Sequence, residues 1–285
     1  MLVEIAGRLP VRVSYFLSSI ASMILWVVSR RIRSATRNHA RHVLGPGADS
    51  AHIDRIARSM VRSAGYYYAD FSRLASVPPE RVFEEVEEVH GIEHLFSALD
   101  EGRGVILIGA HLGGSEILAQ AMAPFGLCLA VITEPLSPPP VHRYVESIRA
   151  HHGVRYFPAT AGGLRSSVAH LRGGGTLGLL VDRDVLGTAE PFPFFGERAP
   201  LPSGAVDLAR RTGAPIVAGW VPRTAPGRYQ LFVERVDMPP PTHDRVADLE
   251  SGMRAMTAAL ESAIRRWPGQ WFALARVWAR DDRTS

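Results

Sequence analysis

The feature that most restricts the fold of this chain is an alternation of apolar runs and helical stretches from residue 104 onward. Short apolar runs occur at 105–109, 128–132, 177–181 and 216–221. Stretches with helical spacing lie at 115–123, 140–151, 162–172 and 203–212. Strands that alternate with helices form parallel sheets, because each crossover helix returns the chain to the same end of the sheet. We therefore expect an α/β fold with a mixed, mainly parallel sheet flanked by helices.

Further elements lie on either side of this alternation. Residues 49–75 have helical spacing, "YQLFVERV" at 229–236 is typical of a strand, and residues 246–267 form an amphipathic pattern that ends at Pro268. No internal repeat or linker is present. We expect a single domain over residues 46–285, preceded by an N-terminal helical region over residues 1–45.

The N-terminal region contains an uncharged stretch, residues 13–29, between clusters of arginine. In a helix, its apolar side chains fall on one face: Phe16, Ile20, Met23, Ile24 and Val27. The stretch is shorter than the roughly 20 apolar residues that span a bilayer, and no small-residue cleavage signature follows it. We expect a helix that lies in a membrane surface. A single membrane span and a core helix of the domain are the alternatives.

The charge composition restricts the partners. The chain has 285 residues, and its 32 basic side chains are all arginine, against 28 acidic ones, for a net charge of +4. Arginine binds phosphate through two donors, so this composition fits an anionic membrane or an anionic substrate. No zinc-finger spacing or aromatic–basic RNA motif points to nucleic acid. The one cysteine, Cys128, excludes an internal disulfide and a cysteine-based metal site.

The stretch "GAHLGGSE" at 109–116 has the composition of a reaction centre. His111 follows a predicted strand, and ligands bind beyond the carboxyl ends of parallel strands. Glu116 falls in the first turn of the next helix, beside free backbone N–H groups. A titratable imidazole, a carboxylate and backbone donors can deprotonate a hydroxyl and stabilise an oxyanion. A solvated histidine beside a helix cap is the alternative, and the spacing does not match the H-E-x-x-H metal motif.

Several blocks in order along the chain carry a resemblance to a known family. They are "RNHARHVLG" (37–45), "GAHLGGSE" (109–116), "HRYVESIRAHHGV" (142–154), the segment 178–217 with D-x-D and F-F-G, and "IRRWPGQWFALARVW" (264–278). The chain resembles the lauroyl/myristoyl acyltransferases of bacterial lipid A biosynthesis, a family of HX4D/E acyltransferases that includes the phosphatidylinositol mannoside acyltransferases. The resemblance covers nearly the whole chain.

This resemblance implies a fold of the glycerol-3-phosphate acyltransferase type and transfer of a fatty acyl chain from acyl-CoA or acyl carrier protein. The acceptor is a hydroxyl of a glycolipid or phospholipid. The motif histidine, here His111, acts as general base, and the motif acid, here Glu116, orients it. In the mannoside acyltransferases a second acid before F-F-G joins the relay, and Glu190 is the nearest match, with a slip of about one position. No metal and no cofactor besides the thioester donor is implied.

Further polar residues complete the predicted site. Arg149 matches a recurrent arginine of the family and is expected to contact phosphate or pantetheine, with a solvated helix position as the alternative. Arg183 follows the strand 177–181 and can pair with a phosphate. Asp182 and Asp184 face either the histidine or Arg183, and a structural ion pair is the alternative for Asp182. Ser115 is expected to contact substrate from the first turn of the helix.

Aromatic side chains in the family blocks have two interpretations each. Those before Gly196 line an acyl tunnel or pack in the core: Phe192, Phe194 and Phe195. Those near the C-terminus lie in a membrane interface or pack in the core: Trp267, Trp271 and Trp278.

Together these features predict an acyltransferase at the cytoplasmic face of the cell membrane, peripheral or monotopic. Its expected partners are an acyl thioester, a lipid acceptor and an anionic membrane surface. A thioester or phosphoester hydrolase with the same His/Glu pair is one alternative, although no G-x-S-x-G nucleophile elbow is present. A non-catalytic lipid-binding protein is the other.

Overall fold

A computed structural model describes residues 9–74, 76–121, 127–133, 143, 145, 148, 154–184 and 186–278. Its main sheet has eight strands, in the order β1-β10-β8-β2-β5-β3-β4, with β9 paired to β10. The strands are β1 (Val86–His90), β2 (Val105–Gly109), β3 (Leu129–Thr133), β4 (Arg155–Pro158), β5 (Thr176–Leu180), β8 (Ile216–Trp220), β9 (Arg223–Ala225) and β10 (Arg228–Val236). All neighbours pair in parallel except β10, which is antiparallel to β8 and β9.

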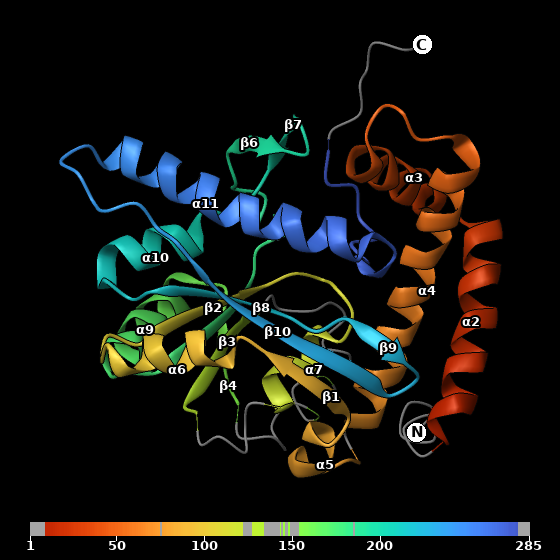
Figure 1. Cartoon of the computed structure of the whole chain (residues 1–285), viewed down its shortest axis with the longest axis horizontal. Helices are drawn as coiled ribbons and strands as arrows, with labels where there is room; N and C mark the ends of the chain where they lie inside the picture. Colours follow the sequence, from red (N-terminus) through yellow and green to blue (C-terminus); the bar gives the residue numbers. More distant parts are fainter. Residues whose placement is uncertain are drawn as a thin grey trace.

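Helices cover both faces of this sheet and one of its ends (Figure 1). They are α2 (Val11–Val28), α3 (Arg30–Leu44), α4 (Ser50–Leu74), α5 (Pro79–Phe83), α6 (Ile92–Asp100), α7 (Ser115–Ala121), α9 (Ala161–Arg172), α10 (Gly204–Thr212) and α11 (Arg245–Arg266). Helices α10 and α11 lie over one face and α6 over the other, whereas α2, α3 and α4 stack at one end (Figure 1). The expected α/β architecture with a mainly parallel sheet is confirmed.

The central strands form because they are apolar along their whole length. All five residues of β2 and all five of β8 are buried, as expected for parallel strands covered on both faces. Strand β1 (VEEVH) was not predicted, since it lies at the sheet edge and four of its five residues are exposed. Its glutamates suit an exposed edge, where charge discourages pairing with another chain.

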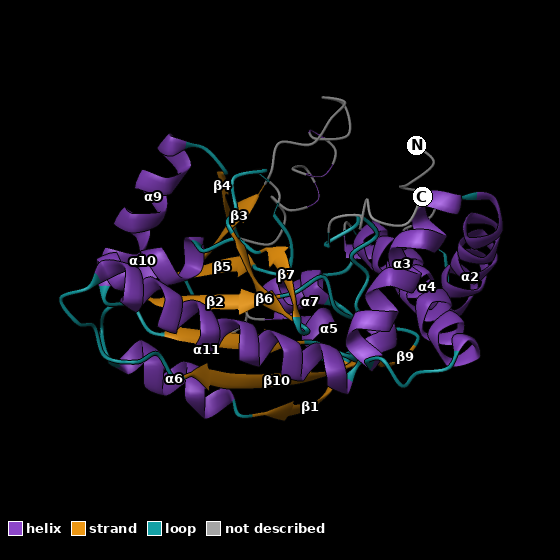
Figure 2. Cartoon of the chain, turned by 90° about the horizontal axis from the view of Figure 1, so that it is seen from above, coloured by secondary structure: helices purple, strands orange, loops and turns teal. Residues whose placement is uncertain are grey.

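The carboxyl ends of the parallel strands face the helices at the end of the sheet. In Figure 2 the arrows of β2 and β5 point toward α7 and the group formed by α2, α3 and α4. The loops that follow these strands therefore lie on the side of the sheet where α4 stands. A site at this edge is what parallel topology predicts for a ligand.

Helix α2 turns its apolar side chains outward. Its buried residues are Ser14, Tyr15 and Ser22, which pack toward α4. Its exposed large apolar residues are Val13, Phe16, Leu17, Ile20, Met23, Ile24, Val27 and Val28. This orientation excludes the core-helix interpretation. In the part of the chain that the structure describes, α2 is the single helix that has the length and hydropathy to cross a membrane.

The F-F-G block forms the turn of a separate hairpin between β6 (Pro191–Phe194) and β7 (Glu197–Pro200). Phe195 has φ 50° and Gly196 has φ 83°, as a two-residue turn of type I′ requires. Phe194 and Phe195 are buried, and the Phe194 ring stacks on Trp278 at 5.3 Å. The core interpretation therefore holds for these phenylalanines, and also for Trp271 and Trp278, which are both buried.

Candidate active site

His111 and Asp182 meet because β2 and β5 are neighbours in the sheet. Gly109 at the end of β2 is in register with Leu180 at the end of β5, and the Val181 N–H donates to the Gly109 carbonyl at 3.0 Å. The chain continues by two residues beyond each strand to reach His111 and Asp182. The loops that follow β2 and β5, which are distant in sequence, thus begin side by side at the carboxyl edge of the sheet.

Asp182 binds the histidine through both carboxylate oxygens. Its Oδ1 lies 2.8 Å from His111 Nδ1, and its Oδ2 accepts from the His111 backbone N–H at 3.1 Å and from Trp271 Nε1 at 2.8 Å. Asp182 is fully buried, which by itself raises the pKa of its carboxyl, but the His111 and Trp271 contacts outweigh burial and the pKa is lowered. The ionised carboxylate therefore keeps the proton of the His111 ring on Nδ1 and leaves Nε2 as the basic atom.

The P-x-Q-W block supports the other side of His111. The Phe272 N–H donates to the His111 carbonyl at 2.7 Å, and Leu112 forms a β-bridge with Trp271. The Phe272 ring stands edge-on to the imidazole, with ring centres 5.8 Å apart. Residues 271–272 therefore pack against the imidazole and hold the backbone of the His111 loop by hydrogen bonds.

A second histidine, His39 on α3, packs against Trp271. The His39 ring packs 4.9 Å from the Trp271 ring, and its Nε2 accepts from the Val277 N–H at 3.2 Å. Burial, followed by the nearby His42 and Arg276, lowers the pKa of His39 to about 3. His39 is thus neutral at physiological pH, and it joins α3 to the segment that holds Asp182.

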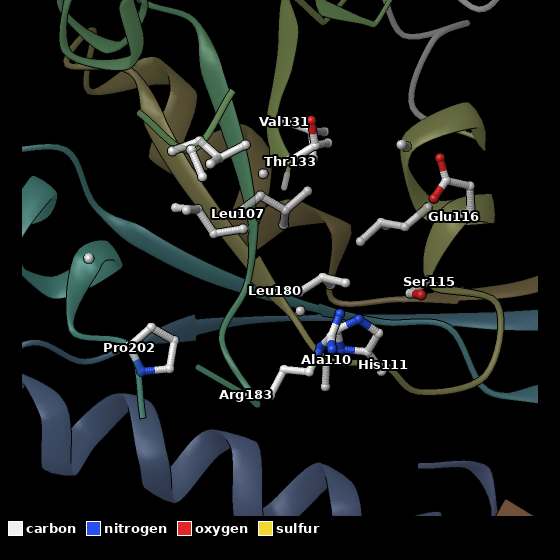
Figure 3. Close-up of a pocket in the computed structure, with 18 of the residues that line it drawn as sticks. Leu107, Ala110, His111, Ser115, Glu116, Val131, Thr133, Leu180, Arg183 and Pro202 are labelled. Carbon is white, nitrogen blue, oxygen red and sulfur yellow. The ribbon is translucent and has the colours of Figure 1, made fainter. Parts of the chain in front are cut away.

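A cavity of about 1020 Å³ opens beside His111 (Figure 3). Its polar lining includes His111, Ser115, Glu116, Arg183 and Asp184. Much of the remaining lining is apolar and comes from the strands and from α4, α7 and α9, including Leu107, Leu118, Leu129, Val131, Leu164, Leu180 and Phe71. A mostly apolar cavity with a few convergent polar groups is typical of a site for a ligand with an apolar body.

Glu116 has a different partner from the one that the family resemblance implied. Its Oε2 accepts a hydrogen bond from the Tyr67 hydroxyl at 3.2 Å. In Figure 3 its carboxylate is directed away from the imidazole of His111. The hydrogen bond to the His111 ring is made by Asp182, so this aspartate faces the histidine.

The four backbone amides of the loop between β2 and α7, which precede the helix turn where donors were expected, are already used inside the protein. The Leu112 N–H binds Ala110 O, the Gly113 N–H binds Gln270 O, and the Gly114 N–H binds Val221 O. Because the His111 N–H binds Asp182, these four amides are not directed at a substrate. An oxyanion beside His111 needs a donor other than these four amides, and the Arg183 side chain is among the groups that line the cavity (Figure 3).

The remaining predicted residues divide between the cavity and the surface. Ser115 begins α7 and lines the cavity. Asp184 also lines it, and its carboxylate accepts backbone N–H groups of the 186–189 loop. Glu190 is exposed and is not among the described residues that line the cavity. Arg149 lies outside the described residues.

Two aromatic residues of the site were not predicted. Tyr67 lines the cavity from α4, and its ring packs 4.8 Å from that of Phe272. Phe272 follows P-x-Q-W directly, so that block was the available signal; the run of three tyrosines at 66–68 does not by itself indicate which ring faces inward. Among the described residues, no three His, Cys, Asp or Glu side chains are grouped as a metal site would require.

Comparison with known proteins agrees with this geometry. The family model for bacterial lipid A biosynthesis acyltransferases matches residues 2–280. The chain belongs to this family. It is therefore an acyltransferase with an acyl donor and a lipid acceptor, and the His111 loop, D-x-D, F-F-G and P-x-Q-W all lie within the matched range.

The chain is also similar to phosphatidylinositol mannoside acyltransferases. It is 27% identical over 260 residues to the enzyme of that name from Mycolicibacterium smegmatis, which covers 86% of this chain and 79% of the relative. It is 24% identical over 252 residues to the one from Mycobacterium tuberculosis strain H37Rv, which covers 86% of this chain and 77% of the relative. These similarities support a lipid acyltransferase of the phosphatidylinositol mannoside or lipid A type.

Proposed function

We propose that this acyltransferase moves a fatty acyl chain from acyl-CoA or acyl carrier protein to a hydroxyl of a membrane glycolipid or phospholipid, with His111 as general base. The observation that carries the proposal is the pair of His111 with Asp182, in which His111 lines a mostly apolar cavity. A buried carboxylate on Nδ1 leaves Nε2 available to accept a proton, and the cavity offers the apolar surroundings that an acyl chain needs.

The reaction follows from the positions of these groups. The acceptor hydroxyl gives its proton to His111 Nε2 while its oxygen attacks the thioester carbonyl. The positive imidazole is stabilised by the Asp182 carboxylate, and Arg183 donates to the oxyanion of the tetrahedral intermediate. The carbon–sulfur bond then breaks, and the leaving thiolate takes the proton from His111. No covalent acyl-enzyme is required.

The names of the similar proteins indicate which acceptor lipids to test. A phosphatidylinositol mannoside is the first acceptor to test, because the relatives that match most of this chain are named for that substrate. A lipid A precursor is the second, in line with the name of the family. Both present sugar hydroxyls on a membrane lipid, which suits a base in the lining of a mostly apolar cavity.

The N-terminal helix suits a membrane-bound acceptor. The outward face of α2 carries eight large apolar side chains, and the helix that follows it begins with two exposed arginines, Arg30 and Arg31. An apolar face beside arginines binds an anionic lipid surface. We infer that α2 lies in the cytoplasmic leaflet and brings the cavity to a lipid that stays in the bilayer.

One assay separates this function from its alternatives. The full chain is incubated with radiolabelled acyl-CoA and either phosphatidylinositol mannoside or a lipid A precursor in mixed micelles, and the lipids and free fatty acid are resolved. We expect a labelled acceptor, and its loss in His111→Ala by a factor of about 10²–10⁴. Label in free fatty acid alone would support a hydrolase. Retention of bound lipid without any turnover would support a lipid-binding protein.

A further inference from the structure

A closed polar cluster lies behind the loop that carries His111, away from the cavity. It consists of Tyr15 on α2, Asp70 on α4, Arg223 at the start of β9, and Tyr229 on β10. The Tyr15 hydroxyl donates to Asp70 Oδ1 at 2.6 Å, while Arg223 donates from Nε to the Tyr15 hydroxyl at 2.7 Å and from Nη2 to Asp70 Oδ2 at 2.6 Å. The Tyr229 hydroxyl lies 3.4 Å from that of Tyr15. Helices α2 and α4 therefore meet the β9–β10 hairpin at one guanidinium.

The cluster is deeply buried. The side chains of Arg223 and Asp70 are 6% and 3% exposed. Burial and the nearby Asp70 raise the pKa of Tyr15 above its usual value, so its hydroxyl keeps its proton and donates to the carboxylate. An ion pair taken out of water at this depth contributes no more to stability than well-packed apolar side chains of similar volume. Its contribution lies in the geometry that a rigid, planar guanidinium imposes on its partners.

One of those partners is the loop of the active site. Arg223 Nη2 also donates to the Gly113 carbonyl at 3.3 Å. The backbone of Arg223 is fixed in turn by Gln270, whose Oε1 accepts its N–H at 2.7 Å and whose Nε2 donates to its carbonyl at 2.9 Å. The Gln270 carbonyl accepts the Gly113 N–H at 3.1 Å. Arg223 thus binds the Gly113 carbonyl, and Gln270 binds the Gly113 N–H.

The space around Gly113 shows how closely this loop is held. Gly113 has φ +57°, and a Cβ atom at this position would lie 2.1 Å from the Val221 carbonyl oxygen. The loop therefore sits directly against the chain that leads from β8 into β9. Arg223 therefore contacts this loop at Gly113, two residues from His111.

We propose that Arg223 is a positioning residue for acyl transfer, and that Tyr15 and Asp70 make α2 and α4 part of the support of the His111 loop. Helix α2 then has a second role besides the proposed membrane contact, because its buried Tyr15 binds the Arg223 guanidinium that contacts the His111 loop. The inference rests on the proposed function of His111, and it extends that function to residues that lie outside the cavity.

Two conservative variants and a matched control test this inference. Tyr15→Phe removes the hydroxyl that binds Arg223 but keeps the ring, and Arg223→Lys keeps the charge but loses the planar fork. Tyr66→Phe is the control. Tyr66 lies in the same interface and stacks 4.4 Å from Tyr15, and its hydroxyl binds Ser19 rather than Arg223. The substitution keeps the Tyr66 ring, which lies 5.4 Å from the Arg223 guanidinium. All three keep the outward face of α2 unchanged, so their sedimentation with anionic vesicles should equal that of the wild-type chain.

Kinetics on a detergent-dispersed acceptor give the first measurement. We expect Tyr15→Phe and Arg223→Lys to lower kcat by about tenfold or more with little change in KM, because a displacement of about 1 Å at a reacting group costs up to about 100-fold in rate. We expect Tyr66→Phe to retain the wild-type kcat. Equal losses in kcat for Tyr15→Phe and Tyr66→Phe, or a raised KM with unchanged kcat, would overturn the positioning role.

A spectroscopic measurement separates this inference from the proposed function. The indole N–H of Trp271 binds Asp182 and reports on the His111 pair, so its NMR resonance, identified with Trp271→Phe, should shift in Tyr15→Phe and Arg223→Lys but not in Tyr66→Phe. A wild-type chain that transfers no acyl group would refute the proposed function, whereas the indole signal would still report on the loop. An unshifted indole resonance in both variants, or a shifted one with unchanged kcat, would overturn the inference.

Discussion

The Nδ1 atom of His111 lies 2.8 Å from Oδ1 of Asp182, although the two residues are 71 positions apart in the sequence. The second oxygen of the same carboxylate binds the His111 backbone N–H and the Trp271 indole, so ring and loop are oriented by one buried group. A histidine held in this way presents a fixed tautomer to the cavity. The following predictions test that arrangement and its surroundings.

Replacement of the two candidate carboxylates should have unequal effects. We expect Asp182→Asn to lower kcat by about 10²–10⁴, because the amide no longer stabilises the positive imidazole or fixes its tautomer. Glu116→Gln should cost less, since this amide still accepts the hydrogen bond of Tyr67. Steady-state kinetics of both variants, with circular dichroism as the check on folding, make the comparison. A larger loss in Glu116→Gln than in Asp182→Asn would return the orienting role to the motif acid.

Arg183 should act on the chemical step. If its guanidinium donates to the oxyanion, Arg183→Gln should lower kcat by about 10²–10³ with a smaller change in KM, because the charge develops only in the transition state. Glu190→Gln is the control, since Glu190 is exposed and is not among the described residues that line the cavity. A rise in the KM of the acyl donor with unchanged kcat would assign Arg183 to binding of the donor instead.

His39 should make stability depend on pH in mildly acidic solution. Above pH 6.5 its imidazole is neutral in both the folded and unfolded chains. Below that value the unfolded chain gains a proton that the folded protein does not take up until about pH 3, so the free energy of unfolding falls as pH falls. Between these two pKa values, His39 contributes up to about 1.4 kcal/mol of unfolding free energy per pH unit.

Chemical denaturation between pH 4.5 and 7 measures this dependence. We expect His39→Gln to flatten the dependence of the free energy of unfolding on pH, whatever the stability of this variant at pH 7. The lowered pKa of Asp182 adds a further loss of stability, but only as the pH falls below its usual value of 3.8, outside this range. An equal slope in wild type and His39→Gln would contradict the prediction.

The outward face of α2 should control membrane attachment. Phe16→Ser with Met23→Ser removes two exposed apolar side chains from α2 and leaves Tyr15 in place. We expect weaker sedimentation with anionic vesicles, slower acylation of a bilayer acceptor, and unchanged kcat on a detergent-dispersed one. The paired control Ser18→Ala, on the inward side, should bind vesicles as the wild type does. Attachment of the wild-type chain that withstands both high salt and alkaline carbonate would show that α2 spans the bilayer.

Much of the architecture followed from local patterns. The predicted strand over 105–109 coincides with β2, and the helix over 203–212 with α10 to within one residue, because a buried strand is apolar throughout and an amphipathic helix repeats every 3.6 residues. The placement of His111 after a strand and of Ser115 at the start of a helix followed in the same way. The family resemblance rested on blocks such as F-F-G, which proved to be a hairpin turn and a core contact.

Tertiary structure decided which carboxylate serves the histidine. Glu116 is close to His111 in sequence, but α7 directs it toward Tyr67, whereas Asp182 arrives from a distant strand because β5 pairs with β2. It also decided that α2 turns its apolar face outward and its tyrosine inward to Arg223. Local sequence specifies period and chain direction, and so it determined the elements and the edge of the sheet where a site can lie. Contacts between side chains depend on the order of the strands and on the rotation of each helix, which only the packed core sets.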